Sequence, residues 1–174
     1  MRVYKKNLSW IIMAAGLFFS SFIDSDGIAD TLPTSKGMYD VLFQNHAGIE
    51  INLQDLKGKV VVINYWARWC APCIAEMQAL NQLYVELKSN KNIVFMAVDM
   101  DRSMNKAIRF MEKRKYSIPV YQINSPIPED LATRSIPTTI ILDKKGFLVN
   151  KHVGAMNFKS IKFKEALQQL SEEL

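Results

Sequence analysis

The segment VVVINYWARWCAPC, residues 60–73, most constrains what this chain can fold into. It opens with a nearly continuous run of β-branched and aromatic residues, Val60–Tyr65, which is typical of a strand buried on both faces. Two cysteines follow three positions apart, at Cys70 and Cys73, and apolar residues then recur every three or four positions as far as Leu87. The segment therefore predicts a buried strand, a short connection, and a helix that carries a thiol pair in its first turn.

The rest of the chain alternates between strand and helix patterns. We expect strands at 39–43 and 49–53, joined by a turn at 45–48, and further strands at 93–98, 120–123, 138–142 and 148–153. A second helix is expected after a capping Ser103, a helical turn at 129–133, and a last helix after a capping Asn157. The expected buried face of the last helix is formed by Ile161, Ala166, Leu167 and Leu170. This order predicts an α/β fold with helices on both faces of a central sheet, and with the thiols at its carboxyl edge.

Residues 1–29 differ in character from the rest of the chain. Arg2, Lys5 and Lys6 give a basic start, an apolar stretch follows over 8–23, and a polar turn leads to the small residues Gly27 and Ala29. This is the layout of a secretory signal, with cleavage predicted after Ala29. Because the apolar stretch is shorter than the roughly 20 residues of a membrane span, an uncleaved anchor or a buried helix are the alternatives. Residues 30–174 are expected to form one folded domain.

Composition excludes several classes of protein. The chain has 174 residues, is 49% hydrophobic and 22% charged, and contains 2 cysteines and 2 histidines. This composition rules out a low-complexity chain and a disulfide scaffold. Because His46 and His152 lie far from the cysteines in sequence, it also favours a protein without a zinc site. The net charge of +5 comes from basic residues scattered over expected loops and helix surfaces, so we expect no nucleic-acid partner.

The paired cysteines predict redox chemistry. At a helix N-terminus, free N–H groups and the helix dipole favour the thiolate of Cys70, and Arg68 would add positive potential. That thiolate would attack a substrate disulfide, and Cys73 would then resolve the mixed disulfide. Pro72 fits the first helical turn, while Trp66 and Trp69 would shield the thiolate and offer a docking surface.

Acidic residues at two places in the sequence have more than one possible role. Glu76, three residues after Cys73, should face the buried side, where a raised pKa would let it take the Cys73 proton; the alternative is an ordinary first-turn acid. Asp99 and Asp101 are interpreted as residues of the loop that leads into the second helix, rather than as a cation site.

The chain resembles the TlpA/ResA branch of the thioredoxin-like superfamily, exported thiol-disulfide oxidoreductases. The resemblance rests on residues 60–73, on the approach NLQDLKGK at 52–59, on Glu76 after the WCxPC motif, and on Ile-Pro-Thr-Thr at 136–139 followed by a strand. Asn64 stands where cytosolic thioredoxins usually carry a buried aspartate. Gln78 replaces a proline common in the active-site helix, so no kink is expected.

This resemblance implies a thioredoxin-like fold, with a mixed sheet flanked by helices and an extra N-terminal β-hairpin. It implies a cis peptide bond before Pro137 opposite the thiols, with the Ile136 peptide, Trp69 and Pro72 binding the substrate. It implies no cofactor, protein disulfides as substrates, apocytochrome c among the candidates, and a membrane thiol donor of the DsbD/CcdA type. We expect a monomer. The alternatives are a net disulfide oxidase and a copper-binding metallochaperone.

Overall fold

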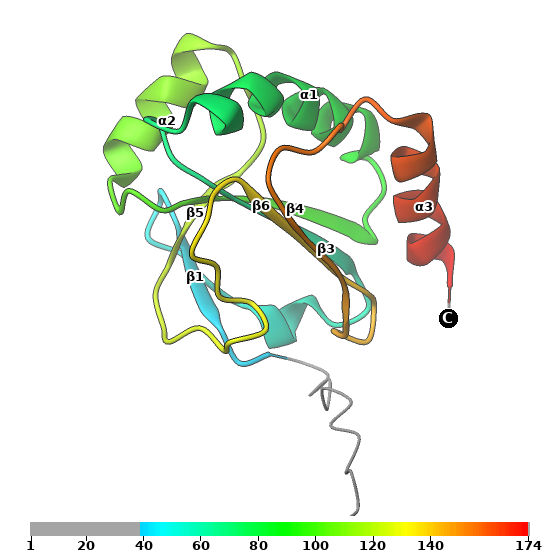
Figure 1. The fold of residues 1–174 in the computed structure, drawn as a ribbon. Coiled ribbons are helices and arrows are strands. Elements are labelled where there is room, and N and C mark those ends of the chain that lie inside the picture. Colours follow the sequence, from blue (N-terminus) through cyan, green and yellow to red (C-terminus); the bar gives the residue numbers. More distant parts are fainter. Residues whose placement is uncertain (1–38, 174) are drawn as a thin grey trace, which may run out of the picture. The chain divides into compact units, whose positions relative to one another are not determined.

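The computed structural model describes residues 39–173, so the signal or anchor expected at 1–29 lies outside it (Figure 1). The strands are β1 (Leu42–Asn45), β2 (Glu50–Asn52), β3 (Val60–Trp66), β4 (Ile93–Asp99), β5 (Val120–Ile123), β6 (Thr138–Leu142) and β7 (Leu148–Val153). The helices are α1 (Ala71–Leu87), α2 (Met104–Lys113), α3 (Ile161–Glu172) and the 3-10 helix η1 (Leu53–Leu56). None of the helices in this part of the chain is long and apolar enough to cross a membrane.

The strands form one mixed sheet in the order β2-β1-β5-β4-β3-β6-β7. Strands β3, β4 and β5 run parallel, and the strands beside them are antiparallel. The N-terminal hairpin is confirmed, with β1 paired to both β2 and β5. Its first strand begins three residues later than predicted, at Leu42, although Tyr39 and Val41 are already buried.

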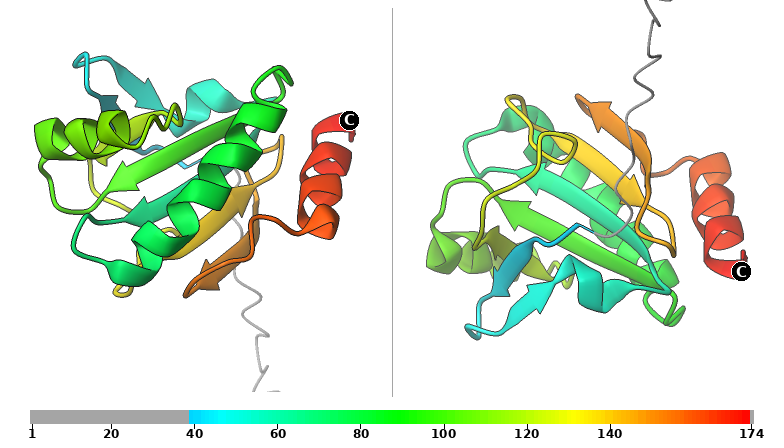
Figure 2. Two further views of the ribbon diagram at one scale, coloured as in Figure 1. Left: turned by 90° about the horizontal axis from the view of Figure 1, so that it is seen from above. Right: turned by 90° about the horizontal axis from the view of Figure 1, so that it is seen from below.

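The prediction of helices on both faces of the sheet was wrong for the α-helices. The buried hydrophobic residues of α1, α2 and α3 all belong to the cluster on one face. The two connections β3-α1-β4 and β4-α2-β5 step across the sheet in the same direction, and right-handed crossovers then place both helices on the same side (Figure 2). The other face is covered by η1 and by the segments around Tyr39 and Leu131.

Two expected helix caps also differ. Ser103 precedes α2 as predicted, but its side chain makes no capping hydrogen bond. The cap of α3 is Ser160, which accepts from the Phe163 N–H at 3.4 Å, whereas Asn157 accepts from Lys159 in the preceding turn. Of the four residues expected on the buried face of this helix, Leu167 is buried and Leu170 is half-buried, whereas Ala166 is exposed and Ile161 is 73% exposed.

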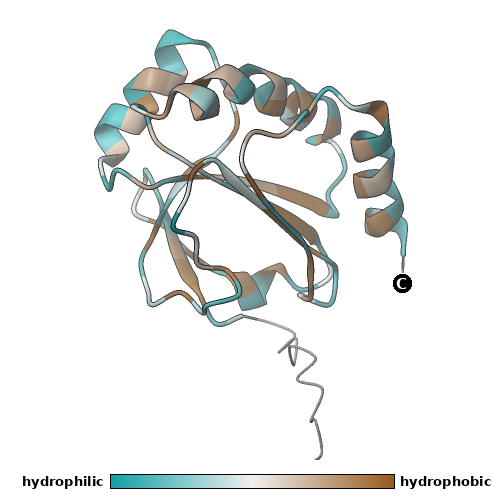
Figure 3. Cartoon of the chain, in the orientation of Figure 1, coloured by the Kyte–Doolittle hydropathy of each residue, from teal (hydrophilic) through white to brown (hydrophobic). Residues whose placement is uncertain are grey.

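The hydrophobic residues are distributed as this arrangement of strands and helices requires. Figure 3 shows mainly hydrophobic strands and helices that alternate between hydrophobic and hydrophilic residues. Strand β3 is buried at all seven positions, as its β-branched run predicted. It lies between β4 and β6, so the connection after Trp66 emerges at the centre of the carboxyl edge of the sheet. This is the position from which the thiol pair is presented.

Candidate active site

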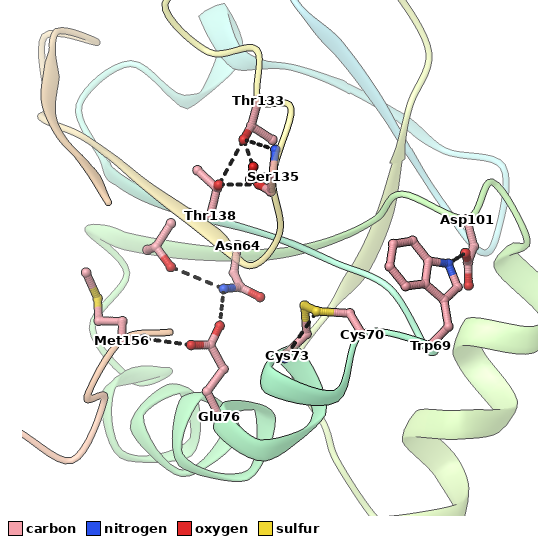
Figure 4. The surroundings of a disulfide bond; sticks show 11 residues. Asn64, Trp69, Cys70, Cys73, Glu76, Asp101, Thr133, Ser135, Thr138 and Met156 are labelled. Atoms are coloured by element: carbon pink, nitrogen blue, oxygen red, sulfur yellow. Dashed lines mark hydrogen bonds between the residues drawn. A yellow bond between two sulfur atoms is a disulfide. The ribbon is translucent and has the colours of Figure 1, made fainter. Parts of the chain in front are cut away.

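Cys70 and Cys73 form a disulfide at the start of α1, with their Cα atoms 5.2 Å apart (Figure 4). Cys70 is the N-cap residue, and its sulfur accepts a hydrogen bond from the Cys73 N–H at 3.3 Å. Pro72 lies in the first turn, where its missing N–H removes no intrahelical bond. The structure therefore places the Cys70 sulfur against the positive end of the helix dipole, which stabilises a thiolate there after reduction.

The two cysteines differ slightly in exposure, and the two tryptophans beside them differ strongly. Cys70 is 4% exposed, whereas Cys73 is fully buried. Trp66 is fully buried in the cluster that contains both cysteines, with its ring 5.3 Å from that of Phe110. Trp69 is 71% exposed, so only this tryptophan offers a surface next to the thiols.

Asp101 connects the two residues that precede Cys70. Its carboxylate accepts a hydrogen bond from the Trp69 indole N–H and lies 3.4 Å from the Arg68 guanidinium. The prediction that Arg68 adds positive potential at the thiols is corrected, because this charge is paired with a carboxylate. Asp99 is the last residue of β4 rather than a loop residue, and its carboxylate accepts hydrogen bonds from the backbone N–H groups of Asp101 and Ser103 in the connection to α2.

Glu76 is buried on the side of α1 that faces the sheet, and it has two hydrogen-bond donors. The Asn64 side-chain amide donates to one carboxylate oxygen at 2.9 Å, and the Met156 backbone N–H donates to the other at 2.7 Å. Asn64 also donates to the Thr139 hydroxyl at 3.1 Å. Burial raises the pKa of Glu76 above its ordinary value of 4.5, although both hydrogen bonds and the charge of His152 act in the opposite direction. A carboxyl in this setting can take up a proton from a nearby thiol.

The segment before β6 carries the expected cis peptide bond, between Ile136 and Pro137. Two hydroxyls surround the Ser135 carbonyl oxygen beside it: those of Thr133 and Thr138 lie 2.7 and 2.6 Å from this oxygen, and 2.9 Å from one another. Within residues 39–173, the Ile136 backbone has no hydrogen-bond partner. This peptide is therefore available to pair with an extended chain.

The structure brings together most of the residues singled out in the sequence. Trp69, the thiol pair and Glu76 all follow β3, and Ile136 packs against the cluster that contains both cysteines. In the part of the chain that the structure describes, no three His, Cys, Asp or Glu side chains gather as a metal site. Neither histidine therefore joins the thiols in such a group.

Comparison with known proteins agrees with this geometry. The Redoxin family model matches residues 28–170. Thioredoxin-like protein YneN of Bacillus subtilis is 34% identical over 126 residues, which is 72% of this chain and 74% of YneN. Thiol-disulfide oxidoreductase ResA of Bacillus cereus is 34% identical over 115 residues, and the match spans 62% of each protein. A crystal structure assigned as a thiol-disulfide oxidoreductase of Bacteroides vulgatus superposes with a TM-score of 0.67, at 29% identity, over 82% of this chain and 99% of that one.

The fold and the redox pair define a thioredoxin-like protein that exchanges thiols and disulfides. The chain belongs to the Redoxin family, and within it to the thiol-disulfide oxidoreductases of the ResA type.

Sequence reasoning missed several residues around the site. Asp101 was interpreted only as a loop residue, and the roles of Thr139 and of the Met156 backbone as polar neighbours of Asn64 and Glu76 were not foreseen. The sequence contains little that could have indicated these contacts. An acid placed two residues after a buried strand is common in loops, and a backbone N–H carries no sequence signature.

Proposed function

We propose that this protein is a reductase of protein disulfides that works outside the cytoplasm as a monomer. The observation that supports this most directly is the pairing of a capping, slightly exposed Cys70 with a fully buried Cys73, close to a buried carboxyl with a raised pKa. Cys70, Cys73 and Glu76 are the proposed catalytic residues. Trp69, Pro72, Ile136 and Pro137 are the proposed substrate-binding residues.

In the proposed reaction, the Cys70 thiolate attacks one sulfur of a substrate disulfide. A mixed disulfide forms, and the other substrate sulfur leaves as a thiolate. The Cys73 thiol then gives its proton to the Glu76 carboxylate, and the resulting thiolate attacks the Cys70 sulfur. The second substrate sulfur leaves, two electrons have passed to the substrate, and the Cys70–Cys73 disulfide seen in the structure is restored.

The proposal also includes a source of electrons for the disulfide and a location in the cell. The oxidised pair must be reduced by a second dithiol, and we propose a membrane thiol donor of the DsbD/CcdA type. The signal-like segment 1–29 and the similarity to ResA support a location in the cell envelope. Disulfides of exported proteins, apocytochrome c among them, are the proposed substrates.

The reduction potential of the Cys70–Cys73 pair tests the proposed direction of electron flow. Equilibration of residues 30–174 with glutathione or dithiothreitol buffers should give a value near that of thioredoxin, about −270 mV. A value near that of DsbA, about −120 mV, would contradict the proposal and support a net oxidase. Reduction of insulin by the dithiol form, followed by turbidity, should agree, with the Cys70→Ser variant as the inactive control.

A further inference from the structure

A polar row crosses three neighbouring strands beneath α1. Asn64 of β3 is in register with Thr139 of β6, and Thr139 is in register with His152 of β7. Partners in antiparallel register place their side chains on the same face of a sheet, and the bond from Asn64 to Thr139 shows which face this is. Glu76 of α1 lies over this row, because it accepts from Asn64. His152 is exposed at the open edge of the sheet, while the rest of the row is buried.

The His152 ring and the Glu76 carboxylate hold the two ends of one peptide group in the loop after β7, the group that joins Ala155 to Met156. One ring nitrogen, Nε2, lies 3.2 Å from the Ala155 carbonyl oxygen. Because a carbonyl oxygen can only accept, this bond requires the proton on Nε2. The N–H of the same peptide group, that of Met156, donates to Glu76 at 2.7 Å. Because the Ala155 carbonyl and the Met156 N–H belong to one planar peptide unit, a displacement of one displaces the other.

His152 is also the charged side chain that acts on Glu76. The other groups that face Glu76 are uncharged: the Asn64 amide, the Thr139 hydroxyl and the Met156 N–H, with Cys73 neutral until its thiol ionises. Lys151, the neighbour of His152 on β7, points to the opposite face, where its ammonium donates to the carbonyls of Asp130 and Ala132. The charge of His152 lowers the pKa of Glu76, against the effect of burial.

We propose that His152 is a positioning residue for proton transfer from Cys73. It holds the peptide group that delivers the Met156 N–H to Glu76, and its positive charge favours the ionised form of Glu76, which can accept the thiol proton. The catalytic consequence rests on the proposed role of Glu76, but the electrostatic link between the two side chains does not.

The test is a carboxyl-carbon NMR titration of Glu76 in the oxidised, disulfide-bonded protein, with the resonance assigned by its loss in Glu76→Gln. His152→Gln keeps an N–H donor and removes the charge, whereas His152→Lys supplies a cation. His46→Gln is the matched control, since His46 is exposed in the turn between β1 and β2, near the opposite edge of the sheet. Amide exchange of Met156 in each variant reports whether the loop is still held.

The titration midpoint of Glu76 should move upward in His152→Gln, stay at or below the wild-type value in His152→Lys, and not move in His46→Gln. An unchanged midpoint in His152→Gln, or equal upward shifts in the Gln and Lys variants, would overturn the proposal. Because the oxidised protein carries no thiol, this result does not depend on the direction of electron flow.

In the reduced protein, the pH midpoint for resolution of a mixed disulfide should shift in parallel with that of Glu76. The loss of rate should be smaller than the roughly 10²-fold expected for Glu76→Gln itself. A shifted titration without a shifted rate profile would show that Glu76 is not the proton acceptor.

Discussion

Asn64 and Glu76 lie side by side in the protein interior, with the Asn64 amide donating to the Glu76 carboxylate over 2.9 Å. Asn64 is 1% exposed and Glu76 is 6% exposed, so neither group has ready access to water. Asn64 acts here through its N–H₂ group, which donates to both Glu76 and Thr139. An aspartate, the usual residue of cytosolic thioredoxins at this position, could not donate to Glu76 when ionised.

The variant Asn64→Asp should therefore be destabilised. It removes two buried donor contacts and places a second acid against Glu76, a cost of about 3 kcal/mol near neutral pH. The cost should shrink as the pH falls, because protonation relieves the repulsion. Urea unfolding of the oxidised protein at several pH values measures this.

Asn81→Asp is the matched control for that variant. Asn81 is also buried and lies on α1, but it uses its oxygen, which accepts from the Ser117 and Ile118 N–H groups at 2.7 and 3.1 Å. Aspartate retains such an oxygen, so this variant should lose less stability than Asn64→Asp. Equal losses in the two variants would show that the donor role of Asn64 does not matter.

Glu76 should make the stability of the oxidised protein depend on pH. Its pKa is raised in the folded state, so the folded protein holds this proton more tightly than the unfolded chain. The resulting stabilisation is complete below the ordinary value of 4.5 and is lost as the pH rises through the folded-state pKa. Glu76→Gln should flatten this part of the stability profile, whereas Glu112→Gln, at an exposed position on α2, should leave it unchanged. A profile in Glu76→Gln that still falls with the wild-type slope would contradict the assignment.

The core of the site could be predicted from sequence because its determinants are local. The β-branched run, the spacing of the cysteines and the apolar period of the following helix specify β3 and the start of α1 within a few residues. The partners of the site residues are not local. The Trp69 indole donates to Asp101, 32 positions further along the sequence. The Glu76 carboxylate accepts from the Met156 N–H, 80 positions further along. Such contacts are set by strand order and by the loop after β7.

The predictions of the helix caps and of the sheet face covered by each helix were wrong for a related reason, since both depend on contacts between distant parts of the chain. Asn157 and Ser160 are both residue types that cap helices well, so local preference could not choose between them. The structure starts the helix after Ser160, with Leu167 packed into the core. The placement of α1 and α2 on one face follows from the strand order β5-β4-β3, which the sequence pattern alone did not define.

Asp101 should matter for protein substrates more than for small ones. Asp101→Ala removes the partner of the Trp69 indole and of the Arg68 guanidinium, so the exposed ring loses its fixed orientation. We expect kcat/KM for a protein disulfide to fall about three- to tenfold, because the docking surface is no longer preorganised. The rate with a small aromatic disulfide should change little. Asp55→Ala, at an exposed position in η1, is the control, and greater acrylamide quenching of tryptophan fluorescence in Asp101→Ala would confirm that Trp69 has been freed. Equal losses with both kinds of substrate would instead indicate damage to the thiol pair.

Export is predicted from residues 1–29, whose basic, apolar and small-residue regions follow the order of a secretory signal. Fractionation of the source cell should recover the protein outside the cytoplasm, and N-terminal sequencing should begin near Asp30 if the segment is cleaved. A membrane-bound form that retains Met1 would identify the segment as an anchor. A cytoplasmic form with Met1 intact would contradict export.

The two cysteines should separate into an attacking and a resolving sulfur. Cys70 accepts the Cys73 N–H at the helix start and is the more exposed of the two, so its thiolate should form at lower pH and reach the substrate first. Cys73 is fully buried, and burial disfavours a thiolate. Cys70→Ser should therefore lose its reaction with substrate disulfides. Cys73→Ser should still attack and should accumulate a mixed disulfide through Cys70, because no second thiol resolves it.

Non-reducing gels and mass spectrometry of trapped adducts measure this directly. The adduct in Cys73→Ser should disappear on treatment with dithiothreitol, and the double serine variant gives the background. Adducts confined to Cys73 in the Cys70→Ser protein would reverse the assignment. Comparable adducts in both single variants would mean that the hydrogen bond to the Cys70 sulfur and the burial of Cys73 do not control which thiol reacts.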